Sequence, residues 1–449
     1  MGEKKFWADW TFPLISLVMF ALLLAAMLSQ MPSITVGSLI SFSSGLLAYT
    51  MMLTVTFMGS RPRFLEKHFG MPQMFEVHGV MSVVLAFLIL IHVIIQWNGF
   101  QSIAEMSLVS QTGWVAVIAL LIVIYTGIFS LSEIFVQYNK TLNVYKNKHN
   151  RELNLWLHRL AIVSIIFVYF HLYALPFLSN NTIFMVLLNI FTIYVLGYWA
   201  IWKIKILTLP KYEVTKLYRG TPTIWVLEVT PVKGQIPQFH GGEYFWIYFR
   251  DGANISKEGH PFSTSSAITD RYSNSIEFMI KDAGDWTESL KNINVGDKLV
   301  LEGPHGDMLP PHIQETDEET VPFILLAGGI GLTPMLSILR QEHQRGSQRE
   351  MHLVWGLSIE EDLFMLDELD EMKAANPNLH VHVIFSWDEV EGYAHGFITN
   401  EYLESVGAAP YHYGHFFVCG PGPMIDATKR IFDHGNVPYD HRHIDDFRF

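Results

Sequence analysis

Two apolar stretches, each carrying a pair of histidines, decide how this chain is built: MPQMFEVHGVMSVVLAFLILIHVIIQ (Met71–Gln96) and LNLWLHRLAIVSIIFVYFHLYALPFL (Leu153–Leu178). The histidines are His78 and His92 in the first stretch, and His158 and His171 in the second. The two pairs have nearly the same spacing, 14 residues in the first and 13 in the second. At a helical rise of about 1.5 Å per residue, either spacing separates its two side chains by roughly 20 Å.

The spacing also predicts which helix faces the histidines share. Fourteen steps return to within about 40° of the same face, whereas thirteen fit one face less well and require helix tilt or a local irregularity. Two such helices side by side would form two His–His clamps, each able to hold a planar haem between two imidazoles. Histidines in apolar helices can instead be satisfied core residues. Ionisable groups inside a membrane are costly and usually functional, so four at matched spacing favour the ligand interpretation.

The composition separates the chain into an apolar half and a soluble half. The chain has 449 residues, half of them hydrophobic, and a length that allows two to four domains. Residues 4–205 are mostly apolar runs, whereas the sequence from Lys211 onward has an ordinary soluble composition. A net charge of −13 argues against a nucleic-acid partner. The single cysteine, Cys419, excludes a disulfide framework, an iron–sulfur cluster and a cysteine zinc site, so redox chemistry requires haem or bound organic cofactors.

Six apolar segments are each long enough to cross roughly 30 Å of hydrocarbon, in contact with membrane lipid. The first follows a basic start, as a signal peptide does, but its weak cleavage site and the apolar segments after it favour an uncleaved helix. The expected spans are Phe12–Leu28, Val36–Met58, Met71–Gln96, Gly113–Phe135, Leu153–Leu178 and Ile183–Ile206.

Charged loops orient these spans. Lys and Arg occur before the first span, between the second and third, between the fourth and fifth, and after the sixth, while the remaining loops carry none. The positive-inside rule therefore places both termini in the cytoplasm, in a plasma (inner) membrane. The inner pair is then His78 with His158, and the outer pair His92 with His171. Arg159 could meet a haem propionate, or it could be an interfacial side chain that snorkels to the membrane surface.

The soluble half predicts two folds in succession. Short alternating segments predict a small antiparallel β-barrel: Trp225–Thr230, Tyr244–Phe249, Ser275–Lys281 and Lys298–Glu302. Apolar runs that alternate with helical stretches then predict a doubly wound parallel sheet: Pro322–Leu326, Met351–Trp355, Leu379–Phe385 and Phe416–Cys419. We expect three domains, at residues 1–208, 209–314 and 320–449. The acidic run Glu315–Glu319 is the expected linker, or else a solvated loop.

Two sets of motifs carry the chemistry of this half. Ala327-Gly-Gly-Ile-Gly-Leu-Thr-Pro334 follows a predicted strand and opens a helix, where glycines let phosphates approach backbone N–H groups. The second set combines three segments: His260-Pro-Phe-Ser-Thr-Ser-Ser266, Gly284-Asp-Trp-Thr287 and Glu302-Gly-Pro-His-Gly306. With the four histidines, these motifs make the chain resemble the ferric reductase and NADPH oxidase superfamily. That superfamily joins a ferric-reductase-like transmembrane domain to a ferredoxin-reductase-like FAD and NAD(P) module.

The resemblance covers nearly the whole chain and implies FAD, two b-type haems, and NADPH or NADH as cofactors. It implies flavin contacts for the first motif, with Phe262 against the isoalloxazine and Ser263 near its N5: His260, Pro261, Phe262, Ser263, Thr264 and Ser266. It implies that a second group holds the FAD pyrophosphate: Lys281, Gly284, Trp286 and Thr287. A third group resembles the nicotinamide-nucleotide pyrophosphate loop: Gly328, Gly329, Gly331, Thr333 and Pro334.

The resemblance also implies catalytic roles near the nicotinamide and the flavin. Cys419, followed by Gly420 and Pro421, would lie near the nicotinamide ring, although a buried cysteine can also be a small hydrophobic core residue. The terminal Phe449 would cover the flavin and move for hydride transfer. With Ser263, these two residues are the expected catalytic set.

Two departures from the superfamily pattern bear on substrate choice. Glu360, Glu361 and Asp362 follow the second strand of the predicted parallel sheet, where NADP-selective members tend to have an arginine. These acids favour NADH without excluding NADPH. Animal oxidases carry a basic residue in an early span, but this chain has no Lys or Arg between Lys5 and Arg61, which argues against superoxide production.

The sequence therefore predicts a transmembrane oxidoreductase. Electrons would pass from cytoplasmic NAD(P)H through FAD and two haems to an extracytoplasmic acceptor, preferably a ferric chelate. Oxygen, a quinone or an external protein carrier are alternative acceptors. Two interpretations without transmembrane electron transfer remain: a transporter or channel with a nucleotide-sensing domain, and a flavin reductase that is merely tethered to the membrane.

Overall fold

The computed structural model describes residues 2–31, 33–97, 107–128, 151–250, 254–267, 274–310, 313 and 321–446. These residues divide into two compact units, a membrane unit that begins at Glu3 and ends at Lys205, and a reductase unit that begins at Ile206. The first contains the apolar helices, and the second contains both sheets.

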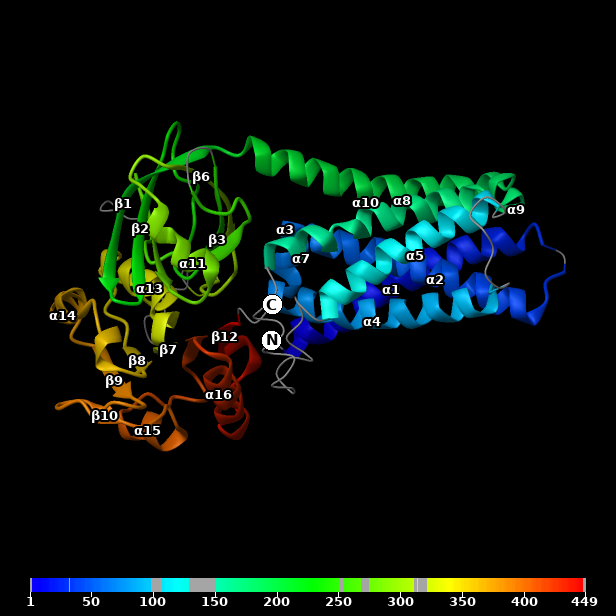
Figure 1. Cartoon of the computed structure of the whole chain (residues 1–449). Coiled ribbons are helices and arrows are strands. Elements are labelled where there is room, and N and C mark those ends of the chain that lie inside the picture. Colours follow the sequence, from blue (N-terminus) through cyan, green and yellow to red (C-terminus); the bar gives the residue numbers. More distant parts are fainter. Residues whose placement is uncertain are drawn as a thin grey trace. The chain divides into compact units, whose positions relative to one another are not determined.

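Among the described residues, six helical segments are long and apolar enough to cross a membrane, as predicted. They are Asp9–Leu28 within α1 (Gly2–Leu28), α2 (Val36–Gly59), α4 (Met71–Ile95), α5 (Leu108–Thr126), Glu152–Tyr173 and α10 (Thr182–Thr208). Two short helices, α3 (Arg63–Phe69) and α9 (Pro176–Ser179), accompany them. Helix α2 packs along α4, and α5 packs along α8, so the histidine-bearing helices each have one main neighbour (Figure 1).

The fifth span is interrupted between its two histidines, as the 13-residue spacing requires: it consists of α7 (Arg151–His158) and α8 (Leu160–Tyr173). The N–H of Arg159 donates to Trp156 O at 3.2 Å, and the N–H of Ile162 donates to Arg159 O at 3.1 Å. Such i→i+3 bonds tighten the helix and add rotation per residue, which turns the later residues toward the face of the earlier ones. The break therefore brings the two histidines of this span closer to one face.

The same span ends earlier than expected. Helix α8 stops at Tyr173 rather than running to Leu178, and Pro176 starts the separate short helix α9. Proline lacks an N–H and clashes with the preceding turn, so it begins helices more readily than it continues them.

In the described part of the reductase unit, the first sheet has six antiparallel strands in the order β4-β3-β6-β1-β2-β5. The strands are β1 (Lys211–Thr221), β2 (Ile224–Pro231), β3 (Tyr244–Phe249), β4 (His260–Ser263), β5 (Ile276–Lys281) and β6 (Lys298–His305). The antiparallel pairing agrees with the prediction, but a closed barrel is not confirmed. One isolated bridge, between Thr264 and Phe278, links the end of β4 to β5 in place of a continuous ladder.

The second sheet is fully parallel, as predicted, with the order β10-β9-β8-β7-β11-β12. Its strands are β7 (Phe323–Gly328), β8 (Met351–Leu357), β9 (Leu379–Phe385), β10 (Ala394–His395), β11 (His415–Cys419) and β12 (Arg442–Asp445). The helices that accompany it are α13 (Leu332–Gln344), α14 (Leu366–Ala375), α15 (Asn400–Ser405) and α16 (Gly422–His434). The strand order reverses between β7 and β11, and ligands of such sheets bind outside the carboxyl ends of the strands at this point.

A buried arginine joins the two sheets of the reductase unit. Arg340 of α13 is 3% exposed and makes two bonds to the carboxylate of Glu368, at 2.7 and 2.8 Å. It also donates to Glu277 Oε1 of β5 at 2.7 Å and to Ser265 O at 2.9 Å. The guanidinium therefore ties the turn after β4 to the first helix of the parallel sheet.

Replacing Arg340 by methionine should lower the free energy of unfolding of the reductase unit by about 3–5 kcal/mol, because the buried Glu277 and the partly buried Glu368 lose their counter-charge. Differential scanning calorimetry of the detergent-solubilised protein measures this loss. The matched control is Lys373→Met, since Lys373 forms an exposed pair with Asp370 that contributes about 0–1 kcal/mol. Equal losses in the two variants would contradict the prediction.

Candidate functional site

The four predicted ligands meet as two pairs inside the membrane unit. The ring centres of His78 and His158 are 6.3 Å apart, and those of His92 and His171 are 6.2 Å apart. A metal–imidazole bond is about 2 Å long and a ring nitrogen lies about 1 Å from its ring centre, so two imidazoles on one ion have centres about 6 Å apart. Both pairs therefore have the separation that a shared metal ion requires.

The Nδ1 atom of each imidazole is hydrogen-bonded to a backbone carbonyl of the neighbouring helix. On α2, Ser41 O accepts from His92 Nδ1 at 2.8 Å, and Val55 O accepts from His78 Nδ1 at 3.1 Å. On α5, Val109 O accepts from His171 Nδ1 at 2.8 Å, and Val123 O accepts from His158 Nδ1 at 3.2 Å. A carbonyl only accepts, so these contacts assign the proton to Nδ1 and leave Nε2 as the ligating nitrogen.

The donor set fits a haem better than a bare metal ion. Within the described ranges, no group of three or more His, Cys, Asp or Glu side chains is arranged to hold a metal. Two imidazoles suffice for a haem, because the macrocycle supplies the other four ligands of the iron. The second nitrogen of each ring is already satisfied, which is the usual arrangement around metal-bound histidine.

The flavin motif forms an aromatic wall at the edge of the antiparallel sheet. Strand β4 pairs with β3, and Trp286 of α11 (Asp285–Glu288) lies against two of its side chains. The Trp286 ring centre is 5.3 Å from that of Phe262, nearly parallel to it, and 4.5 Å from that of His260. The Trp286 indole N–H is buried and has no hydrogen-bond partner in the described part of the chain. A buried donor without a partner is what a site for an anionic or carbonyl-bearing cofactor would offer.

Other residues of the predicted FAD site are buried or bonded to nearby backbone, and they stabilise the local fold. Thr264 and Ser266 are fully buried, with Thr264 Oγ1 donating to Ser266 O at 3.1 Å. Ser266 Oγ accepts from the Glu277 N–H at 3.1 Å, which fastens the turn to β5. Thr287 Oγ1 accepts from the Gly284 N–H at 3.1 Å and so caps the short helix of Trp286. Ser263 lies at the end of β4 and is 8% exposed.

Lys281, which the resemblance places at the FAD pyrophosphate, forms an ion pair with the nucleotide-binding half of the unit. Its ammonium is 2.7 Å from a carboxylate oxygen of Asp362, which also accepts from Thr223 Oγ1 at 2.6 Å. Asp362 is 3% exposed, so it binds these two side chains rather than an incoming ribose. Of the three acids expected to select NADH, Glu360 and Glu361 remain candidates.

Two glycine-rich turns lie against each other at the point where the strand order reverses. A Cβ on Gly331 would lie 2.1 Å from Cys419 O, and a Cβ on Gly328 would lie 2.6 Å from Pro421 Cδ. A Cβ on Gly420 would lie 2.8 Å from Met424 Sδ and 3.1 Å from the Gly328 backbone. These three glycines are therefore required for close packing of the turns after β7 and β11.

The other residues of the predicted phosphate loop have different surroundings. Gly329 has a φ of +53° and open space around its missing Cβ, so it is the glycine that leaves room for a ligand. Its carbonyl accepts from Trp355 Nε1 at 3.0 Å. Thr333 donates to Ile330 O at 2.9 Å, and Pro334 is buried in the first turn of α13.

Cys419 ends β11 beside these turns and is 7% exposed. Burial raises the pKa of its thiol, and the nearby carboxylates of Asp445 and Asp446 raise it further. Strand β12, which carries Asp445 beside Cys419, was missed from the sequence, so these carboxylates were missed too. Phe449, the predicted flavin cover, lies outside the described residues.

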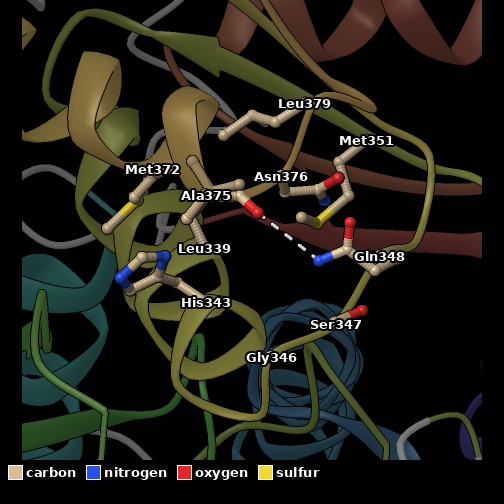
Figure 2. A pocket seen from close by; sticks show the side chains of 10 residues that line it. All are labelled: Leu339, His343, Gly346, Ser347, Gln348, Met351, Met372, Ala375, Asn376 and Leu379. Atoms are coloured by element: carbon tan, nitrogen blue, oxygen red, sulfur yellow. Dashed lines mark hydrogen bonds between the residues drawn. The ribbon is translucent and has the colours of Figure 1, made fainter.

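Figure 2 shows a pocket beside the parallel sheet. It is lined by residues at the starts of β8 and β9, including Met351 and Leu379, and by Met372 of α14. Gln348 Nε2 donates to Ala375 O across it at 3.4 Å. Because nucleotides bind at the carboxyl ends of parallel strands, this pocket at the amino ends is not the nucleotide site.

Comparison with known proteins identifies the reductase unit. Residues 223–321 match the model of an FAD-binding domain, and residues 325–430 match that of an oxidoreductase NAD-binding domain. The reductase component of propane 2-monooxygenase from Mycolicibacterium goodii is 29% identical over 243 residues, 52% of this chain and 66% of the relative. The Na(+)-translocating NADH-quinone reductase of Actinobacillus succinogenes has a component that is 28% identical over 172 residues, 36% of this chain and 40% of the relative.

A solved structure extends the similarity at the level of fold. Flavohemoglobin from Malassezia yamatoensis, with bound FAD and haem, has a TM-score of 0.50 and 15% identity, and the match covers 90% of this chain and 97% of that one. The chain spans 62–66% of the length of the first two propane 2-monooxygenase reductase components that it matches. The matches of residues 223–321 and 325–430 to the two domain models confirm the predicted FAD- and NAD(P)-binding module.

The raised pKa of Cys419 predicts that its thiol stays neutral at physiological pH and reacts slowly with alkylating agents, because the thiolate is the nucleophile. At about pH 8, iodoacetamide should modify the folded protein far more slowly than the guanidinium-unfolded protein. Mass spectrometry reads the result directly, since this is the only cysteine of the chain. Equal rates in the two states would show that the thiol is exposed and ionises normally.

Proposed function

Because residues 223–430 form a ferredoxin-reductase-like FAD and NAD(P)-binding module, we propose that this chain is a transmembrane oxidoreductase. It takes electrons from cytoplasmic NAD(P)H and passes them through FAD and two b-type haems to an acceptor on the other side of the membrane. The preferred acceptor is a ferric chelate. The proposal places the chain in a plasma (inner) membrane with both termini in the cytoplasm.

One observation carries the proposal beyond the reductase module: two pairs of imidazoles at metal-sharing distance in the helices of the membrane unit. Buried ionisable groups in such helices are costly and are retained for function. A transporter could use single histidines to relay protons. It would not require two pairs with matching separations, each with its second nitrogen held by a carbonyl.

When bound, NAD(P)H supplies a hydride, FAD divides the electron pair into single electrons, and haem iron carries one electron at a time. The residues of this chain bind and orient those groups. Phe262 would offer an aromatic face to the flavin ring, and Trp286, which stacks against Phe262, would offer its buried N–H to the FAD pyrophosphate. Gly329 leaves room for phosphate beside the first turn of α13. Cys419, as a neutral side chain, would lie near the nicotinamide.

The histidine pairs also restrict the acceptor. The two imidazoles of each pair would hold one haem iron between them, which would leave the iron no free position to bind a ferric chelate or oxygen. Reduction would therefore take place at the haem edge. A membrane potential that is negative inside favours the outward electron step by about 2.3 kcal/mol per electron per 100 mV.

The test begins with the absorption spectrum of the purified protein, which should show low-spin haem that NADH or NADPH reduces anaerobically. His92→Ala should remove about half of the haem and abolish ferric-chelate reduction, because one of the two imidazoles that would hold the haem of the His92/His171 pair is lost. His68→Ala is the matched control: His68 lies on α3, with its Nδ1 bonded to Phe64 O of its own helix. It should change neither quantity.

The competing functions give different results in this experiment. A protein without haem absorption would favour a transporter or channel. Acceptor reduction unchanged by His92→Ala would favour a tethered flavin reductase. Reduction of cytochrome c that superoxide dismutase abolishes, with no ferric reduction under anaerobic conditions, would favour superoxide production.

A further inference from the structure

The carbonyls that hold the four histidines follow a regular pattern on two helices. On α2 the acceptors are Ser41 and Val55, and on α5 they are Val109 and Val123. The separation is 14 residues on both helices. Four positions after each acceptor the chain has a glycine: Gly45, Gly59, Gly113 and Gly127. The sequence therefore repeats one arrangement four times, a carbonyl that accepts from imidazole and a glycine one turn later.

The glycine position matters because of helix geometry. A side chain leans toward the amino end of its helix, over the preceding turn. Serine and threonine use this direction to bond the carbonyl four residues earlier, so any side chain at that position occupies the approach to that carbonyl. Glycine leaves the approach open to a ring from another helix.

The four positions differ in how closely the imidazole approaches. A Cβ on Gly45 would lie 2.9 Å from His92 Nδ1, and a Cβ on Gly113 would lie 3.1 Å from His171 Nδ1. A Cβ on Gly127 would make ordinary contact with His158 at 3.4 Å, and a Cβ on Gly59 would meet nothing within 4 Å. Close packing is thus confined to the His92/His171 pair.

The hydrogen bonds show the same difference. Both Nδ1 contacts of the His92/His171 pair are 2.8 Å, whereas those of the His78/His158 pair are 3.1 and 3.2 Å. A shorter bond from Nδ1 makes an imidazole a more basic ligand. A more basic axial ligand stabilises ferric iron and lowers the reduction potential.

We propose that Gly45 and Gly113 are positioning residues, which lower the potential of the haem held by His92 and His171 by letting both imidazoles reach backbone carbonyls. The inference rests on the proposed function, because it requires haem between the pairs. On this proposal, the haems of the two histidine pairs have different reduction potentials, and the difference arises from backbone packing alone.

The experiment compares four variants, Gly45→Ala, Gly113→Ala, Gly127→Ala and Gly59→Ala, by potentiometric titration and electron paramagnetic resonance of the purified protein. The two low-spin ferric signals should be separable, since the imidazole planes meet at 85° in the His92/His171 pair and at 45° in the His78/His158 pair. His92→Ala identifies which signal belongs to which pair. Gly59→Ala is the matched control, on the same helix as Gly45 and in the same relation to an acceptor carbonyl.

The expected result is graded. Gly45→Ala should raise the potential of the His92/His171 haem most, Gly113→Ala should raise it less, and Gly127→Ala and Gly59→Ala should leave both haems unchanged. The His78/His158 signal is the internal measure of folding in each variant. If Gly45→Ala loses both haems, the looser contact at Gly113 decides the question.

Two failures are distinguishable. A wild-type protein without haem would overturn the proposed function. Two haems with unchanged potentials and signals in both Gly45→Ala and Gly113→Ala would overturn this inference alone, as would a Gly59→Ala variant that shifts the His92/His171 haem equally.

Discussion

The hydrogen bond from imidazole Nδ1 to a backbone carbonyl of the next helix is the interaction on which the membrane unit depends. Each of the four contacts satisfies a polar group in an apolar interior, where a lost partner is costly. The same contact fixes the tautomer and ring direction of each histidine. The same histidines therefore determine both helix packing and ligand geometry. They join α4 to α2 and the fifth span to α5, and they are the residues that would hold the metal.

The reductase unit also depends on a few close buried contacts, which are made by glycines and an arginine rather than by histidines. The glycine turns after β7 and β11 pack so closely that Gly331 has no room for a Cβ beside Cys419. Arg340 of α13 bonds both to Ser265 O, within the flavin motif, and to Glu368. Hydride transfer requires flavin and nicotinamide to be close together. These buried contacts fix the position of the two sheets relative to each other, which hydride transfer depends on.

Much of the chain could be predicted because its patterns depend on local chemistry. Six apolar segments, the strands with alternating or continuous apolar residues and the presence of an FAD- and NAD(P)-binding module were predicted correctly from the sequence. Strand β1 was missed because Lys211, Lys216 and Arg219 obscure its alternation. The role of Lys281 as a partner of Asp362 was missed because their positions are 81 residues apart.

The sequence by itself determined which residues can serve as ligands and how far apart they lie along each helix, since composition and helical rise are local properties. The loop charges predicted which histidines pair, but only the tertiary structure decided that the rings of each pair lie at a metal-sharing separation, because that depends on how the helices pack. It also supplied the break at Arg159 that accommodates a spacing of 13 residues. The tight imidazole approach at Gly45 and Gly113, and its absence at Gly59, likewise follow from helix packing and from no local pattern.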